Sequence, residues 1–287
     1  MSAAPPLLSP AGAQPPGWEA RLELGFERVD GANTLVRRRH RGPLRVQRPF
    51  QPDPEGPCQV IVLHPPGGVV GGDRLSIDVR LGERAEALLT TPGATKFYRS
   101  LGATALQQTS LRVAPGALLE WLPLETLLFD GARAQLETSV QLAPGASFLG
   151  WEITGLGLPA SGRPFETGSC HTRWQIWREA KPLWIDRAHL CGGDERLQAE
   201  WGLAGHSVTA SLIFAGAGEL GRDEVRACLA EHAFEGRTAT TTLGEVLICR
   251  VLADSTRPVL ELFSNVRDRL RRTVLDAPAS TPRIWAT

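Results

Sequence analysis

A run of apolar residues at 118–132 carries acidic side chains at positions where a carboxylate needs a partner. On a strand, successive side chains point to opposite faces, so Glu120 would share one face with Leu118 and Leu122. The opposite face, which contains Trp121, is apolar as well. Because an unpaired buried charge is very costly, we expect Glu120 to face an ion-pair partner, a partner protein or internal water.

Other acidic residues repeat this theme in neighbouring strands and turns. Together they could line a polar passage through the protein for a hard or borderline cation, since carboxylate oxygens suit such ions. For each single residue, a local hydrogen bond in a turn is an equally good interpretation. The set predicted to line the passage is Asp73, Asp78, Glu120, Glu125, Asp130 and Glu152.

Cysteine and histidine give a weaker signal for metal binding. His171 follows Cys170, and His189 stands two residues before Cys191, so either pair could hold Ni²⁺ or Zn²⁺. No third ligand stands at a recognisable spacing, which favours the interpretation without metal. No CxxC spacing occurs, and we expect reduced, mostly buried thiols at Cys58, Cys170, Cys191, Cys228 and Cys249.

A dense run of glycine and proline directly follows the apolar residues 60–63. Paired glycines allow backbone angles closed to other residues, and the two prolines stiffen the entry. The run predicts a specified turn. Its histidine could be a metal ligand, but a lone histidine beside a turn is more often hydrogen-bonded locally, which is the interpretation that we favour. The run is neither a Walker loop nor a GxGxxG fingerprint that opens a helix, so nucleotide binding has no support. The residues are His64, Pro65, Pro66, Gly67, Gly68, Gly71 and Gly72.

Composition excludes several classes of function. Lys and Arg together number 31, as do Asp and Glu, so no overall positive field would gather nucleic acid or anionic lipid. No apolar run approaches the roughly 20 residues that cross a bilayer, and no signal peptide is recognisable. Nor is there a GxSxG elbow or a framed Cys/His signature. We therefore expect a cytoplasmic protein without catalytic residues.

The elements that must position these residues are mostly strands. Residues 1–17 are rich in Pro, Ala and Gly and predict a disordered tail, which leaves 18–287 as one β-rich domain. From Trp18 onward, apolar and polar residues alternate with the period of a half-buried strand. The same period returns at 74–81 and 134–142.

A repeated fragment indicates how these strands are arranged. Residues 79–85, 111–117 and 140–146 each read as a strand end, a turn and a new strand, and they start 32 and 29 residues apart. Such offsets suit stacked β units in which each rung covers the next. Ordinary hairpin turns would give a similar pattern, and the sequence leaves both readings open.

Two segments in the last third depart from the β pattern. Helical spacing appears at 222–235, and again from Pro258 to Leu270 with Ser255 or Thr256 as the cap. The second helix has a clear apolar stripe, and its other side carries Arg267, Asp268, Arg269, Arg271 and Arg272, which we interpret as solvated rather than partner-binding. The predicted fold is mainly β, a stacked, β-helix-like single domain with about two C-terminal α-helices.

Several blocks in serial order resemble the UreD/UreH urease accessory family. The resemblance covers nearly the whole predicted domain and includes Trp121 and Trp285 among its motif residues. The blocks are GPLRVQRPF at 42–50, HPPGGVVGGDRL at 64–75, TTPGATKFYRS at 90–100, LEWLPLETLLFDGA at 119–132, GWEITGLGLPASGRPF at 150–165 and PRIWAT at 282–287.

The resemblance implies a non-catalytic scaffold. Members of the family are expected to bind the helical accessory protein UreF and, through it, the GTPase UreG, as dimers within a complex that docks on apo-urease. Nickel would pass transiently through an internal tunnel, with no tightly bound cofactor. This chain departs from the usual blocks at Leu124, Leu158 and Arg163, so we place no metal-handling role on residues 158 and 163.

Two alternative functions remain for the chain: a stand-alone metal- or ligand-binding β module and an unrecognised hydrolase.

Overall fold

The computed structural model describes residues 17–54, 56–158, 161–216, 218–279 and 281–286. The predicted disordered tail, apart from Gly17, lies outside the described residues. The first strand begins at Glu19, close to the predicted start of the domain. Trp18 was predicted to lie on the buried face, but its side chain is 60% exposed, because it precedes the strand and is fixed only by its backbone.

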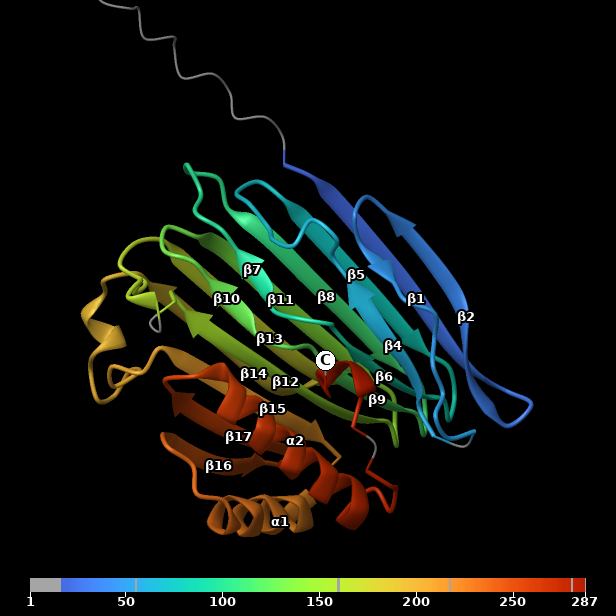
Figure 1. The fold of residues 1–287 in the computed structure, drawn as a ribbon. Coiled ribbons are helices and arrows are strands. Elements are labelled where there is room, and N and C mark those ends of the chain that lie inside the picture. Colours follow the sequence, from blue (N-terminus) through green and yellow to red (C-terminus); the bar gives the residue numbers. More distant parts are fainter. Residues whose placement is uncertain (1–16, 55, 159–160, 217, 280, 287) are drawn as a thin grey trace, which may run out of the picture.

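Two large sheets make up most of the molecule (Figure 1). The first sheet has seven strands in the order β14 (Lys181–Cys191), β13 (Ser169–Arg178), β11 (Arg133–Leu142), β8 (Ala105–Val113), β5 (Arg74–Leu81), β1 (Glu19–Val29) and β2 (Ala32–Arg41). The second sheet has ten, in the order β16 (Arg237–Leu243), β17 (Val246–Ala253), β15 (Val208–Ala215), β12 (Ser147–Leu156), β9 (Leu118–Leu122), β6 (Glu86–Thr90), β4 (Cys58–Leu63) and β3 (Arg45–Val46). The other two strands are β10 (Thr126–Leu128), which pairs with β12, and β7 (Thr95–Phe97), which pairs with β10.

In the middle of the chain, from β5 to β12, each rung contributes one strand to the first sheet and the next strand to the second sheet. β5, β8 and β11 pair in parallel in the first sheet, where Val79 stands beside Leu111 and Leu111 beside Val140. β6, β9 and β12 do the same in the second sheet. The 32- and 29-residue offsets of the repeated fragment therefore equal the distances along the sequence between residues that stand side by side in neighbouring strands. The stacked interpretation is confirmed, since hairpin turns would join neighbours within one sheet.

The repeated turn uses one backbone conformation on three successive rungs. Gly116 and Gly145 have φ values of +67° and +72°, and Arg84 stands at the equivalent position with φ +55°. For an L-residue other than glycine, this left-handed backbone conformation costs roughly 1–2 kcal/mol of free energy. Glycine removes that cost on two rungs, whereas the first rung retains it.

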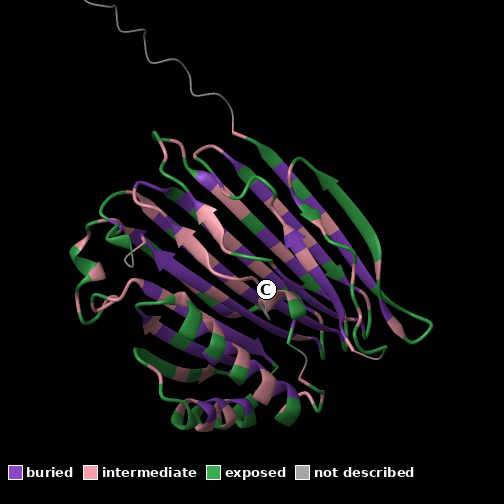
Figure 2. Ribbon diagram, in the orientation of Figure 1, coloured by how far each residue is buried: buried purple, intermediate pink, exposed green. Residues whose placement is uncertain are grey.

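Two apolar cores lie on opposite faces of the second sheet. One fills the space between the sheets, and the other lies between the second sheet and the helices. Residues of β9 alternate accordingly, with Leu119 and Trp121 in the first core and Leu122 in the second. Figure 2 shows the consequence, because central strands of the second sheet such as β9 and β12 are buried along most of their length, whereas the edge strand β16 is mostly exposed.

Both predicted helices are present. The helix α1 spans Gly218–Glu231, four residues earlier than predicted at each end. His232 lies outside it, with its ring Nδ1 2.8 Å from the carbonyl oxygen of Cys228, a contact that ends the last turn. The helix α2 spans Thr256–Thr273, follows the N-cap residue Ser255 and packs against α1. Within the described residues, no helix is long and apolar enough to cross a membrane.

The turn geometry gives a first prediction. We expect Gly145→Ala to lower the free energy of unfolding by about 1 kcal/mol, because φ is positive there although a Cβ atom would meet only the amide nitrogen of Gly116, at an ordinary contact distance of 3.8 Å. Urea unfolding measures the change. Gly93→Ala is the control, since Gly93 has open space without a positive φ. Equal losses in both variants would show that the turn conformation is not the cause.

Candidate functional site

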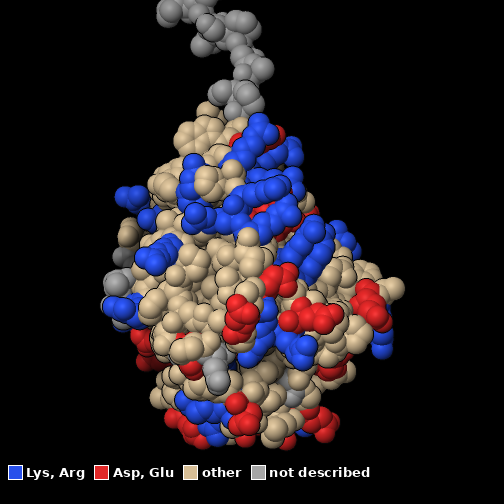
Figure 3. Space-filling model, turned by 90° about the vertical axis from the view of Figure 1, so that its right-hand side faces the viewer, with Lys and Arg blue, Asp and Glu red and all other residues tan. Residues whose placement is uncertain are grey.

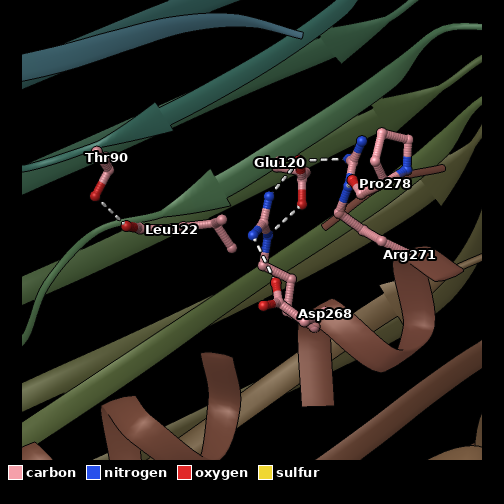
Figure 4. A network of polar contacts seen from close by, with 7 residues as sticks. Thr90, Glu120, Leu122, Asp268, Arg271 and Pro278 are labelled. Carbon is pink, nitrogen blue, oxygen red and sulfur yellow. Dashed lines mark hydrogen bonds and ion pairs between the residues drawn. The ribbon is translucent and has the colours of Figure 1, made fainter. Parts of the chain in front are cut away.

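Glu120 lies at the centre of a fully buried network of charges (Figure 4). It stands on β9 facing α2, with 0% of its surface exposed. Arg267 donates to it twice, from Nε to Oε1 over 2.7 Å and from a terminal nitrogen to Oε2 over 3.2 Å. Arg271 adds a third bond to Oε2 over 2.8 Å. The sequence left three alternatives for Glu120, namely an ion-pair partner, a partner protein or internal water. The structure shows the first, and the ion-pair partners are these two arginines.

The interpretation of the polar side of α2 as solvated was wrong for two of its arginines. Arg267 and Arg271 are 0% and 1% exposed, whereas Arg272 remains in solvent. Residues four apart share one flank of a helix, and this flank faces Glu120. Burial alone opposes the charge on Arg267, but Glu120 and then Asp268 outweigh it and raise its pKa.

The C-terminal segment covers the same face of the second sheet. Arg271 donates from Nε to the carbonyl oxygen of Pro278 over 2.9 Å. Trp285 donates from its indole nitrogen to the hydroxyl of Thr90 over 2.8 Å, and its ring lies 5.5 Å from that of Trp151. Thr90 in turn donates to the carbonyl oxygen of Leu122 over 2.6 Å. Four motif blocks that are far apart in the sequence therefore meet here.

A cavity of about 380 Å³ lies between the two sheets. Trp121 lines it from β9 and Trp174 from β13. Among its lining residues, Gly67, Pro92 and Gly93 are exposed, so the cavity reaches the surface near these two turns. The ionisable residues along its wall are His64, Lys96, Glu137 and Glu152.

Glu152 is the acidic group that faces this interior from β12. Its Oε2 accepts a hydrogen bond from the indole nitrogen of Trp174 over 3.0 Å, which links the two sheets. Burial raises the pKa of its carboxyl group, and the bond from Trp174 opposes that shift only in part. A row of pairings continues from Glu152 through Ser211 to Arg250, which forms an ion pair with Asp186 over 3.0 Å. Glu152 is therefore the inward end of this row, whereas Arg250 at its other end is exposed.

The glycine- and proline-rich segment forms the turn at one end of the cavity. The amide of Gly67 donates to the carbonyl of His64 over 3.0 Å. A Cβ atom at Gly68 would lie 2.0 Å from the ring of Tyr98, and one at Gly71 would meet a serine hydroxyl at 2.2 Å, so close approach explains both glycines. Burial lowers the pKa of the His64 ring despite the opposing charge of Asp73, which favours the neutral imidazole.

Two acidic residues predicted to line a passage instead hold turns together. Asp73 accepts hydrogen bonds from the amides of Trp18 and Val70, over 2.8 Å and 3.0 Å. Asp130 accepts from the amide and hydroxyl of Thr167 over 2.8 Å and 2.9 Å. Although desolvation opposes it, these bonds lower the pKa of Asp130.

The remaining predicted residues also lie away from the cavity wall. Asp78 is on the outer face of the first sheet, 3.6 Å from Arg21 and 3.8 Å from Arg112. Glu125 follows β9, where its carbonyl accepts a bond from the amide of Thr95. Of the six predicted residues, Glu152 alone is among those that line the cavity. The sequence did not reveal which acidic side chains face inward, because that depends on which face of each strand the helices cover.

Three of the four predicted side chains, His171, His189 and Cys191, come together across β13 and β14, whereas Cys170 is buried in the core between the sheets. The rings of His171 and His189 stack with centroids 3.7 Å apart, and the thiol of Cys191 lies 3.1 Å from His189 Nε2. Among the described residues, no group of three or more His, Cys, Asp or Glu side chains is arranged to hold a metal ion. All five cysteines are free and four are buried, as expected.

Together, the two stacked sheets and the helical layer define a β-solenoid-like protein. The sequence profile described as UreD urease accessory protein matches residues 19–286. The chain belongs to this family.

Relatives from distant bacteria support the assignment over nearly the full length. The chain is 43% identical over 272 residues to Urease accessory protein UreD 2 of Brucella anthropi, covering 94% of this chain and 99% of the relative. It is 40% identical over 273 residues to Urease accessory protein UreD of Nitrosococcus oceani, with 95% and 92% covered. The Pseudomonas aeruginosa relative of that name is 42% identical over 272 residues, with 95% and 96% covered.

The buried charges give a second prediction. Glu120→Leu leaves two buried guanidinium groups without their carboxylate, and we expect a loss of about 3–5 kcal/mol in the free energy of unfolding. Replacing Arg267 and Arg271 by leucine in the same chain should recover much of that loss, because an apolar cluster replaces the ion pairs. Urea unfolding compares the two variants.

The control is a solvent-exposed pair in the same helix, Arg257 and Glu261. Glu261→Leu should leave the unfolding midpoint nearly unchanged, because exposed pairs contribute little. A loss for Glu120→Leu no larger than that of Glu261→Leu would mean that the buried network does not stabilise the fold.

Glu152 gives a third prediction. Since its pKa is raised in the folded protein above the usual 4.5, ionisation opposes folding, and the cost develops as the pH rises through the unfolded-state pKa. Glu152→Gln should therefore gain stability over the parent as the pH rises above that value and level off above the folded-state pKa. Melting curves from about pH 4 to about pH 9 would measure the difference. A difference independent of pH would contradict the assignment.

Proposed function

We propose that this protein is a non-catalytic scaffold in urease maturation, acting in the cytoplasm with UreF and UreG on apo-urease and helping to deliver nickel to its active site. Two facts support the proposal. The chain belongs to the UreD urease accessory family over residues 19–286, and an interior cavity between the two sheets has ionisable residues, Glu152 among them, on its wall. We also propose that it is dimeric within the accessory complex, as the resemblance implies.

The cavity is the observation that carries the nickel proposal. A water molecule needs roughly 10–15 Å³ of such space, so about 380 Å³ accommodates a hydrated cation. Glu152 supplies carboxylate oxygens and His64 a neutral imidazole, both of which suit Ni²⁺. Lys96 on the same wall would oppose tight cation binding. Such a lining fits transient passage of cargo rather than a resident cofactor.

Of the residues proposed to line the route, Glu152 is a better test residue than Glu120. Glu120 was one of the six predicted lining residues, yet both its oxygens accept bonds from arginines on the helix side of the second sheet. Its replacement would disturb the helical layer, so a change in nickel loading would not report on a route. Glu152 faces the cavity and is the better probe.

The test combines deletion of the gene with two variants in cells that express the urease operon. Deletion should remove both urease activity and urease-bound nickel, and the tagged parent chain should retain UreF and UreG. Glu152→Gln should keep those partners while lowering urease-bound nickel several-fold, since the cavity loses its inward-facing carboxylate. Asp78→Asn, which removes a carboxylate from the outer face of the first sheet, is the matched control.

Different results separate the parts of the proposal. Full urease activity without the gene would reject the accessory role and restore the readings as a stand-alone binding module or hydrolase. Normal nickel loading with Glu152→Gln would reject the cavity as the route while leaving the scaffold role intact. Equal losses with Glu152→Gln and Asp78→Asn would also reject a specific role for the cavity.

A further inference from the structure

The strand β2 forms one free edge of the first sheet. It is the last strand in the sheet order, and among the described residues it pairs with β1 alone. At the N-terminal side of the segment 37–41, Leu35 and Arg37 oppose Phe26 and Gly25, so Val36 forms a bulge and is 51% exposed. Beyond the bulge the pairing is regular. Apart from the ladder with β1, no backbone hydrogen bond of residues 37–41 is found within the described part of the chain. One side of this strand therefore presents unpaired amides and carbonyls.

The same five residues form an unusual concentration of positive charge, which we call the β2 basic edge: Arg37, Arg38, Arg39, His40 and Arg41. All five are exposed. Figure 3, which views the molecule from the side of β1 and β2, shows basic side chains gathered over the upper part of this face. Because the whole chain has a formal net charge of zero, this cluster reflects segregation of charge rather than a generally basic protein.

Both faces of the strand carry the charge. Arg39 stands opposite Glu23, on the outer face of the first sheet, whereas Arg38 stands opposite the core residue Leu24 on the other face. Glu23 already forms ion pairs with Arg21 over 3.1 Å and with Arg37 over 3.0 Å. No acidic side chain of the described residues lies within 4.0 Å of Arg38, Arg39 or Arg41.

Charged residues on an edge strand often serve only to prevent pairing with another sheet. A few charges are enough for that purpose, whereas here every side chain of a five-residue stretch is cationic or a histidine. The charge that repels a neutral or basic edge attracts an acidic one. The open backbone groups can then extend the sheet by one more strand.

We propose that the β2 basic edge binds an acidic, extended segment of a partner protein, which adds as a further strand of the first sheet. Carboxylates on both faces of that strand would pair with the arginines, while its backbone pairs with residues 37–41. A nucleic acid would satisfy the charges but has no peptide backbone to continue the ladder, so the geometry favours a polypeptide. This interaction does not depend on the proposed role in nickel delivery.

The test uses the full chain and a fluorescein-labelled peptide of alternating glutamate and threonine, nine residues long, in fluorescence anisotropy at low salt. We expect the substitutions Arg38→Gln, Arg39→Gln and Arg41→Gln, made together, to weaken binding at least tenfold. Rising salt should weaken the parent's binding as well. The control, Arg84→Gln, Arg226→Gln and Arg272→Gln together, removes the same charge from exposed positions elsewhere and should bind like the parent.

A second peptide, methylated on alternate backbone nitrogens, separates strand addition from simple attraction of charge. It keeps every carboxylate but cannot donate along one edge, so we expect it to bind at least tenfold more weakly. Amide exchange of residues 37–41 should slow at alternate positions when the unmodified peptide binds. The proposal is overturned by equal binding to the two arginine variants, by equal binding of the methylated peptide, or by tighter binding of a short DNA duplex than of the peptide.

Discussion

The burial of one carboxylate constrains much of this architecture. Glu120 stands on a strand whose two faces are both covered, and an unpaired charge there would cost far more than a domain can lose. Three hydrogen bonds from Arg267 and Arg271 satisfy it. Those arginines fix the rotation of α2 about its axis, because only one flank of the helix can face β9. The apolar stripe of α2 then packs on the second sheet beside them.

From that contact the helix side of the molecule follows. Arg271 also holds the carbonyl of Pro278, and the chain then continues to Trp285, which bonds to Thr90 and packs against Trp151. The second sheet is thereby covered on both faces, while the outer face of the first sheet remains in solvent. The two sides of the molecule therefore differ. On one side, helices pack on the second sheet; on the other, the first sheet faces solvent and ends in the β2 basic edge.

The stacked part of the fold was predictable because its signal is periodic. Apolar alternation in residues such as Leu75 and Ile77 marks strands, and the repeated fragment encodes their registers directly. The second helix was also predicted in the right place, since its apolar stripe is long. The site was predicted less completely. Glu152 was placed in the interior set, but so were Asp78 and Asp130, which the structure puts on the outer surface and in a turn.

The sequence by itself determined the class of fold, the rung spacing, the family and the need for a partner at Glu120, because these depend on local periodicity, on serial motifs and on the cost of burying charge. Only the tertiary structure decided which partner Glu120 has, which acidic residue faces the cavity and where the basic edge lies. The physical reason is that each depends on which face of a strand is covered, and by what. The sequence pattern predicted that Arg267 and Arg271 are solvated, because Glu120, which is 147 and 151 residues away from them in the chain, pairs with them only in the folded state.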